Sequence, residues 1–147
     1  MKKITKSQSP TPSSRPPNLD PQNPVKILIV EDSVTQAMQL QHILEGNGYS
    51  AVIAVDGREA LRSIGASRPS IVISDIVMPE MDGFELVQHI IQRQKEKRSS
   101  IIILSNLGQK EDVEKGLALG ADGYIVKASA TPSEVVEKVV EITSHKN

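Results

Sequence analysis

The sequence predicts an α/β fold in which helices cover both faces of a five-stranded parallel sheet. Five short apolar runs recur along the chain, and segments with helical spacing of apolar residues separate and follow them. Three of these runs are almost continuously aliphatic and β-branched, as expected of strands that are buried on both faces. Alternation of strand and helix is typical of a doubly wound sheet with right-handed crossovers. The five runs are 26–30, 51–54, 71–74, 101–104 and 123–126.

The five predicted helices are recognised by their start and stop signals. Polar residues that can cap a helix N-terminus precede four of them, and two of these residues have a partner at capping-box spacing, Gln36 and Glu134. Gly120 ends the fourth helix, which begins at about Lys110. The charged run 94–98 is interpreted as a solvated end of the third helix. The predicted caps are Ser33 and Thr131, and the pairs Asp56-Gly57 and Asp82-Gly83 are predicted to open the second and third helices.

The first 24 residues differ in composition from the rest of the chain. They hold six of the nine prolines and carry a net charge of +3, whereas residues 25–147 carry −4. A segment with so few large apolar side chains cannot offset the entropy cost of its ordering. We therefore predict a disordered Pro/Ser-rich tail over 1–24 and one folded domain over 25–147, which is long enough for a single core.

Composition excludes several classes of protein. A weakly acidic domain lacks the basic face that a nucleic-acid-binding protein needs. The absence of cysteine excludes disulfides, zinc–thiolate centres, iron–sulfur clusters and thiol catalysis. No apolar run approaches the roughly 20 residues of a membrane span. No apolar stretch follows the N-terminal lysines, so a signal peptide is not expected. A cytoplasmic protein that binds neither membrane nor nucleic acid is therefore expected.

Polar residues follow four of the predicted strands directly. Glu31 and Asp32 follow the first strand, Asp75 the third, Ser105 the fourth and Lys127 the fifth. In open α/β sheets, ligand sites form outside the carboxyl ends of the strands. We therefore expect three carboxylates, one hydroxyl and one ammonium to share a crevice at that edge of the sheet.

The chemistry of this set indicates phosphoryl transfer. Crowded carboxylates repel one another, and a hard divalent cation with oxygen ligands, best Mg²⁺, relieves the repulsion. Mg²⁺ together with Lys127 makes a positive field that suits the oxygens of a transferring phosphoryl group. Asp75 is placed centrally to act as the nucleophile and form an aspartyl phosphate. Ser105 and Lys127 can each contact a phosphoryl oxygen.

The same residues resemble those of the response-regulator receiver family, the CheY-like phosphoacceptor domains. The resemblance is carried by 29–33, 74–83, 104–105 and 120–127, and it covers Val25 to about Ser144. It implies a flavodoxin-like sheet with strand order 2-1-3-4-5. Because the chain ends shortly after the last predicted helix, a stand-alone receiver is expected rather than an enzyme.

The resemblance also implies roles for individual residues. A histidine kinase or a histidine phosphotransfer protein would phosphorylate Asp75 with Mg²⁺ as cofactor. The metal ligands would be Asp32, Asp75 and the backbone carbonyl of Val77, with Glu31 acting directly or through water. Phosphorylation would draw the Ser105 hydroxyl inward and let the Tyr124 ring rotate inward. The face made by the fourth helix, fifth strand and fifth helix would then change its contacts with an output protein, and a phosphorylation-dependent dimer is compatible with this.

Two positions depart from the family pattern, and two other functions stay open. Ala128 follows Lys127 where the family usually has proline, which predicts a trans peptide bond. Asn106 replaces the usual small residue after the switch hydroxyl. A haloacid-dehalogenase-type hydrolase would also form an aspartyl phosphate, but it needs a second acid where this chain has Val77. A phosphorylation-independent adaptor with a vestigial site is the other alternative, and the complete polar set argues against it.

Overall fold

The computed structural model describes residues 24–94 and 98–145, and the predicted tail lies outside them except for Pro24. Five strands alternate with five helices, as predicted, and one short 3-10 helix is added after the last strand. The strands are β2 (Lys26–Val30), β3 (Ser50–Ala54), β4 (Ile71–Ser74), β5 (Ser100–Ser105) and β6 (Gly123–Val126). The helices are α1 (Val34–Gly46), α2 (Gly57–Ser67), α3 (Gly83–Arg93), α4 (Lys110–Leu119), η2 (Lys127–Ser129) and α5 (Pro132–His145).

The sheet has the predicted topology. All neighbouring strands pair in parallel in the order β3-β2-β4-β5-β6, which is order 2-1-3-4-5 when the strands are counted along the chain. The β4–β5 register places Ser74 beside Ile103, and the β5–β6 register places Ile103 beside Tyr124. The carboxyl ends of the three central strands therefore lie at one edge, which is where the polar residues follow them.

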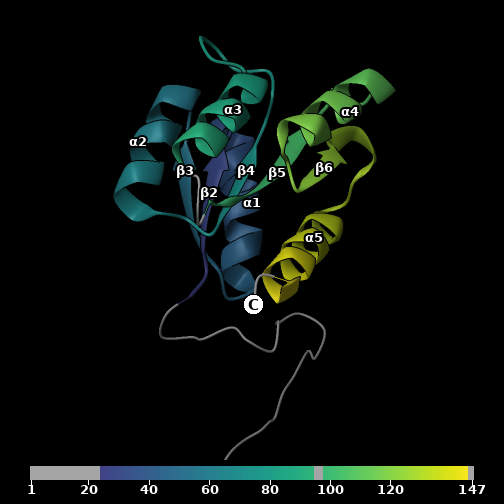
Figure 1. Ribbon diagram of the computed structural model, residues 1–147. Coiled ribbons are helices and arrows are strands. Elements are labelled where there is room, and N and C mark those ends of the chain that lie inside the picture. Colours follow the sequence, from purple (N-terminus) through teal and green to yellow (C-terminus); the bar gives the residue numbers. More distant parts are fainter. Residues whose placement is uncertain (1–23, 95–97, 146–147) are drawn as a thin grey trace, which may run out of the picture.

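Two hydrophobic clusters fill the two sides of the sheet, and Figure 1 shows the helices that cover them. α1 and α5 cover one side, where their side chains pack on Ile27, Ile29 and Ile73. α2, α3 and α4 cover the other side over Leu28, Val72 and their neighbours. Alternate residues of one strand thus enter different clusters, as expected for a strand buried on both faces. Among the described residues, no helix is long and apolar enough to cross a membrane.

The predicted helix caps are confirmed, but one predicted capping box is wrong. The Asp82–Glu85 pair at the start of α3 and the Thr131–Glu134 pair at the start of α5 make reciprocal bonds. At α1, the Ser33 hydroxyl accepts from the Gln36 backbone N–H at 3.3 Å, as a cap should. The Gln36 side chain does not complete the box, because it turns instead to Lys127.

The charged run 94–98 is not simply a solvated helix end. Residues 95–97 lie outside the described residues, but Arg98 lies between α3 and β5 and pairs with Asp122 at 3.0 Å. Its guanidinium also donates to the carbonyls of Ser99 and Gly120, both at 3.0 Å. Arg98 therefore ties the start of β5 to the turn that leads into β6, at the amino end of the sheet.

Candidate functional site

Asp75 lies immediately after β4, in the middle of the sheet, and is 8% exposed. One carboxylate oxygen, Oδ1, accepts from the backbone N–H groups of Ile76 at 2.6 Å and Val77 at 3.3 Å. Gly83 begins α3 so close to this turn that an added Cβ would lie 2.3 Å from the Asp75 carbonyl oxygen. The tight approach of α3 and the two N–H groups hold the carboxylate in place and leave Oδ2 for other partners.

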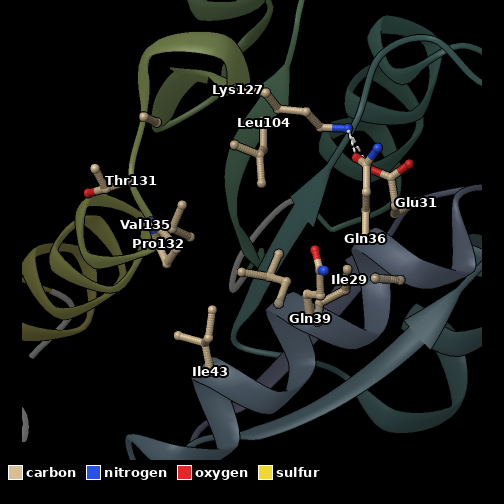
Figure 2. A pocket seen from close by; sticks show the side chains of 13 residues that line it. Ile29, Glu31, Gln36, Gln39, Ile43, Leu104, Lys127, Thr131, Pro132 and Val135 are labelled. Carbon is tan, nitrogen blue, oxygen red and sulfur yellow. Dashed lines mark hydrogen bonds and ion pairs between the residues drawn. The ribbon is translucent and has the colours of Figure 1, made fainter.

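Lys127 reaches this carboxylate from the end of β6. Its Nζ lies 2.9 Å from Asp75 Oδ2 and 2.7 Å from Glu31 Oε1, and its side chain is 16% exposed. Figure 2 shows that Gln36 of α1 also points at the ammonium, and its Oε1 lies 2.8 Å from Nζ. Burial opposes the ammonium charge, but hydrogen bonds to Glu31 and Asp75 and their charges outweigh it and raise the pKa of Lys127. The side chain is therefore a cation at neutral pH.

The two carboxylates that pair with Lys127 belong to a cluster of three. Ligand oxygens of Glu31, Asp32 and Asp75 all lie within 4.8 Å of one another. Glu31 is buried and its second oxygen accepts from the Ser33 N–H at 3.1 Å, whereas Asp32 is exposed to solvent. One ammonium cannot balance three carboxylates, so an excess of negative charge remains among closely spaced oxygens. Such a set fits a hard divalent cation, and Mg²⁺ is the cation whose ligand preferences it matches best.

Ser105 and Tyr124 lie on the strands next to this group. Ser105 ends β5, is fully buried, and its Oγ accepts from the Leu107 N–H at 3.3 Å. The Tyr124 hydroxyl donates to the Leu107 carbonyl. Its ring lies against α4, where a Cβ added at Gly116 would come within 3.0 Å of it. Burial, then the charges of Asp112 and Asp75, raise the pKa of Tyr124, so the hydroxyl stays a neutral donor.

The remaining predicted positions contribute no side-chain hydrogen bond to the site within the described residues. Val77 is 62% exposed, and its backbone N–H, not its side chain, binds Asp75. Asn106 is exposed. The bond between Lys127 and Ala128 is trans, as the departure from proline predicts. Ala128 lies inside the short helix η2.

Gln36 is the side chain that joins the site, within the part of the chain described, without having been indicated by the sequence. Its position three residues after Ser33 has an ordinary explanation as half of a capping box. The local pattern does not show whether the Gln36 side chain completes the cap or contacts Lys127, which lies 91 residues further along the chain. Only the packing of the end of β6 beside the start of α1 decides between them.

Comparison with known proteins identifies the family. Residues 27–140 match the family model of the response regulator receiver domain. The chemotaxis protein CheY of Treponema pallidum is 35% identical over 95% of this chain and 98% of that protein. The regulatory protein PhoP of Bacillus subtilis is 35% identical over 80% of this chain but only 48% of its own length. This chain thus spans a whole chemotaxis relative and about half of a transcriptional one.

A solved structure with the same fold comes from a chemotaxis complex. The CheX–CheY–BeF₃–Mg²⁺ complex of Borrelia burgdorferi contains a chain that is 32% identical, covers 82% of this chain and 90% of its own, and has a TM-score of 0.76. The name of that structure includes BeF₃ and Mg²⁺ as components of the complex. The sequence match, the shared fold and the acidic site agree, and the haloacid-dehalogenase alternative is set aside. The chain belongs to the response regulator receiver domain family of two-component signalling proteins.

Proposed function

We propose that Asp75 accepts a phosphoryl group from a phosphohistidine of a histidine kinase or a histidine phosphotransfer protein. The observation that carries the proposal is the environment of its carboxylate. Oδ1 accepts two backbone N–H groups, Oδ2 faces Lys127 at 2.9 Å, and two further carboxylates lie within 4.8 Å. A fixed, charged nucleophile beside a cation is what phosphoryl transfer requires.

The transfer balances with the groups present on the two proteins. A carboxylate oxygen of Asp75 attacks phosphorus, an O–P bond forms, and the N–P bond to the donor imidazole breaks. An electron pair of the carboxylate becomes the new O–P bond, and the leaving imidazole nitrogen keeps the N–P electron pair and takes up a proton from solvent. Lys127 then stabilises the negative charge that the phosphoryl oxygens bring with them from the donor.

Asp32, Asp75 and the Val77 carbonyl would hold Mg²⁺, with Glu31 joining directly or through water. When bound, Mg²⁺ supplies charge neutralisation at the transferring oxygens. The excess of carboxylate over ammonium supports this assignment, because repulsion among the three carboxylates is relieved only by a further positive charge.

We further propose that α4, β6 and α5 form the face that an output protein reads. Tyr124 links them to the site, since its ring lies against Gly116 of α4 and its hydroxyl binds the loop that follows Ser105. A shift of Ser105 toward a phosphoryl group would change that loop and with it the position of Tyr124. The domain boundary at Val25, the cytoplasmic location and a phosphorylation-dependent dimer stay predictions.

Phosphorylation by a small donor tests the assignment of Asp75. The purified protein is incubated with phosphoramidate and Mg²⁺, and its intact mass is followed with time. One added phosphoryl group is expected in the wild type and none in Asp75→Asn. The matched control is Asp82→Asn, because Asn caps a helix about as well as Asp and Asp82 is the exposed cap of α3. Equal labelling of Asp75→Asn would contradict the proposal, and an unlabelled wild type that also fails to bind BeF₃⁻ would favour the adaptor.

A further inference from the structure

The ammonium of Lys127 has all of its hydrogen-bonding capacity in use. An ammonium group has three hydrogens to donate. Three acceptors surround Nζ, namely Glu31 at 2.7 Å, Gln36 at 2.8 Å and Asp75 at 2.9 Å. Glu31 and Gln36 come from the stretch that leads from β2 into α1 and Asp75 follows β4, so bonds from two parts of the sheet edge fix where the amine lies.

Two of these three acceptors have another role in the proposed function. Asp75 is the residue that takes the phosphoryl group, and Glu31 is one of the carboxylates proposed to hold Mg²⁺. Neither can serve Lys127 fully once it is engaged in those roles. Gln36 is neutral and does not belong to the carboxylate cluster. Of the three acceptors, only Gln36 keeps its oxygen for Lys127 both before and after phosphoryl and metal binding.

The position of Gln36 suits it to hold the amine. It lies in the first turn of α1, and its own backbone N–H is fixed by the Ser33 hydroxyl at 3.3 Å. Its side chain crosses from α1 toward the end of β6 at the mouth of a cavity of about 220 Å³ between α1 and α5 (Figure 2). The start of a capped helix is a rigid place from which to hold a flexible lysine.

We propose that Gln36 is a positioning residue that keeps the Lys127 amine beside Asp75 while the carboxylates bind phosphoryl and metal. This inference rests on the proposed function of Asp75. A positioning role and a role in helix stability alone predict different results. If Gln36 positions the amine, loss of its oxygen frees one ammonium hydrogen and loosens the amine, but leaves the carboxylates unchanged.

The test compares Gln36→Met with Gln39→Met. Methionine keeps the length and helix propensity of glutamine but removes the amide acceptor. Gln39 is a matched control, since it is exposed on the same helix, lines the same cavity, and has no hydrogen bond from its side chain within the described part of the chain. Two quantities are measured, the exchange rate of the Lys127 ammonium protons with water by ¹⁵N NMR and the BeF₃⁻ concentration for half-saturation at saturating Mg²⁺.

Gln36→Met is expected to speed ammonium proton exchange severalfold. It should also raise the BeF₃⁻ concentration for half-saturation about fivefold, the equivalent of one modest hydrogen bond. Gln39→Met is expected to change neither. Unchanged exchange in Gln36→Met would overturn the inference, and so would faster exchange with unchanged BeF₃⁻ binding. If wild-type protein shows no BeF₃⁻ binding that depends on Asp75, the proposed function fails, and the exchange rates then decide separately whether Gln36 holds Lys127.

Discussion

The two ends of the sheet each hold ion pairs that join distant parts of the chain. At the amino end, Arg98 before β5 pairs with Asp122 before β6 at 3.0 Å. At the carboxyl end, Lys127 after β6 pairs with Glu31 at 2.7 Å and Asp75 at 2.9 Å. The distances are alike, but the balance of charge is not.

Among the described residues, the amino-end cluster pairs one guanidinium with one carboxylate. Asp122 also accepts the backbone N–H of buried Ile101 at 2.8 Å. At the carboxyl end, one ammonium pairs with Glu31 and Asp75, and Asp32 adds a third carboxylate to the same cluster. The ion pair at the amino end joins two elements, whereas the excess of carboxylates at the carboxyl end fits the metal and the phosphoryl group that we propose for it.

The largest expected effect separates the two ends by chemistry. Asp75→Asn should lose all phosphorylation, because an amide is not the nucleophile that a carboxylate is, while its similar shape keeps the fold. Asp122→Asn should be phosphorylated like the wild type. Both are checked by intact mass after phosphoramidate treatment and by circular dichroism. A labelled Asp75→Asn protein, or an unlabelled Asp122→Asn protein that is folded, would end the distinction between the two ends.

Lys127→Met should have the next largest effect, a loss of about 3 kcal/mol in the free energy of unfolding without Mg²⁺. Removing the ammonium leaves Glu31 and Asp75 buried without their cation. Urea denaturation measures the loss. Arg98→Met should cost less, since the Arg98 and Asp122 side chains are 30% and 34% exposed and water replaces part of their pairing.

The pH dependence of the stability lost in Lys127→Met shows whether lost charge or lost packing causes it. Because the pKa of Lys127 is raised in the folded protein, its contribution is fully present below its ordinary value of 10.5. The contribution disappears as the pH rises through the higher folded value. The difference between wild type and Lys127→Met should therefore stay constant from neutral pH to about pH 10 and shrink above it. A difference that persists unchanged at higher pH would show that lost packing, not lost charge, explains the variant.

Mg²⁺ should stabilise the folded protein by binding at the carboxyl end of the sheet, and changes at the amino end should not alter this gain. At a hundredfold excess over its dissociation constant, a ligand that binds the folded state adds about 2.7 kcal/mol. Thermal denaturation with and without Mg²⁺ should show this gain in the wild type and in Asp122→Asn. In Asp32→Asn the gain at the same Mg²⁺ concentration should be much smaller, because one ligand is neutral. Equal gains in all three proteins would place the metal elsewhere.

Asp122→Ala should have a smaller effect, which concerns stability and not phosphorylation. It leaves the Ile101 N–H without its acceptor, at a cost of about 2 kcal/mol. Asp122→Asn keeps an oxygen for this N–H and should recover most of the loss. The measurement is urea denaturation of both variants. If Asn is as costly as Ala, the charge pairing with Arg98 matters more than the backbone bond.

The sequence predicted the carboxyl end of the sheet better than the amino end. Runs such as 71–73 are apolar throughout and predict a buried parallel sheet. The rule that sites lie after such strands points directly to Asp75 and Lys127. Confirmed elements include all five strands, with β5 one residue longer at each end than the predicted run. These features depend on local sequence patterns, which can be recognised without knowing which distant segments meet.

Gln36 and Arg98 show why the rest was not predictable. Both are long polar side chains at positions where a helix start or a solvated helix end is the ordinary explanation. Their actual partners, Lys127 and Asp122, lie 91 and 24 residues away. The partner of such a side chain is set by which segments meet in three dimensions, and local spacing carries no signal of it.

The most direct test of the central claim is to find where the phosphoryl group is carried. The phosphorylated protein is treated with borohydride, which reduces an acyl phosphate to an alcohol and converts a phosphorylated aspartate to homoserine, and the peptides are sequenced by mass spectrometry. We expect homoserine at position 75 only, and only when Mg²⁺ was present during phosphorylation. Homoserine at another aspartate, or equal modification without Mg²⁺, would contradict the account.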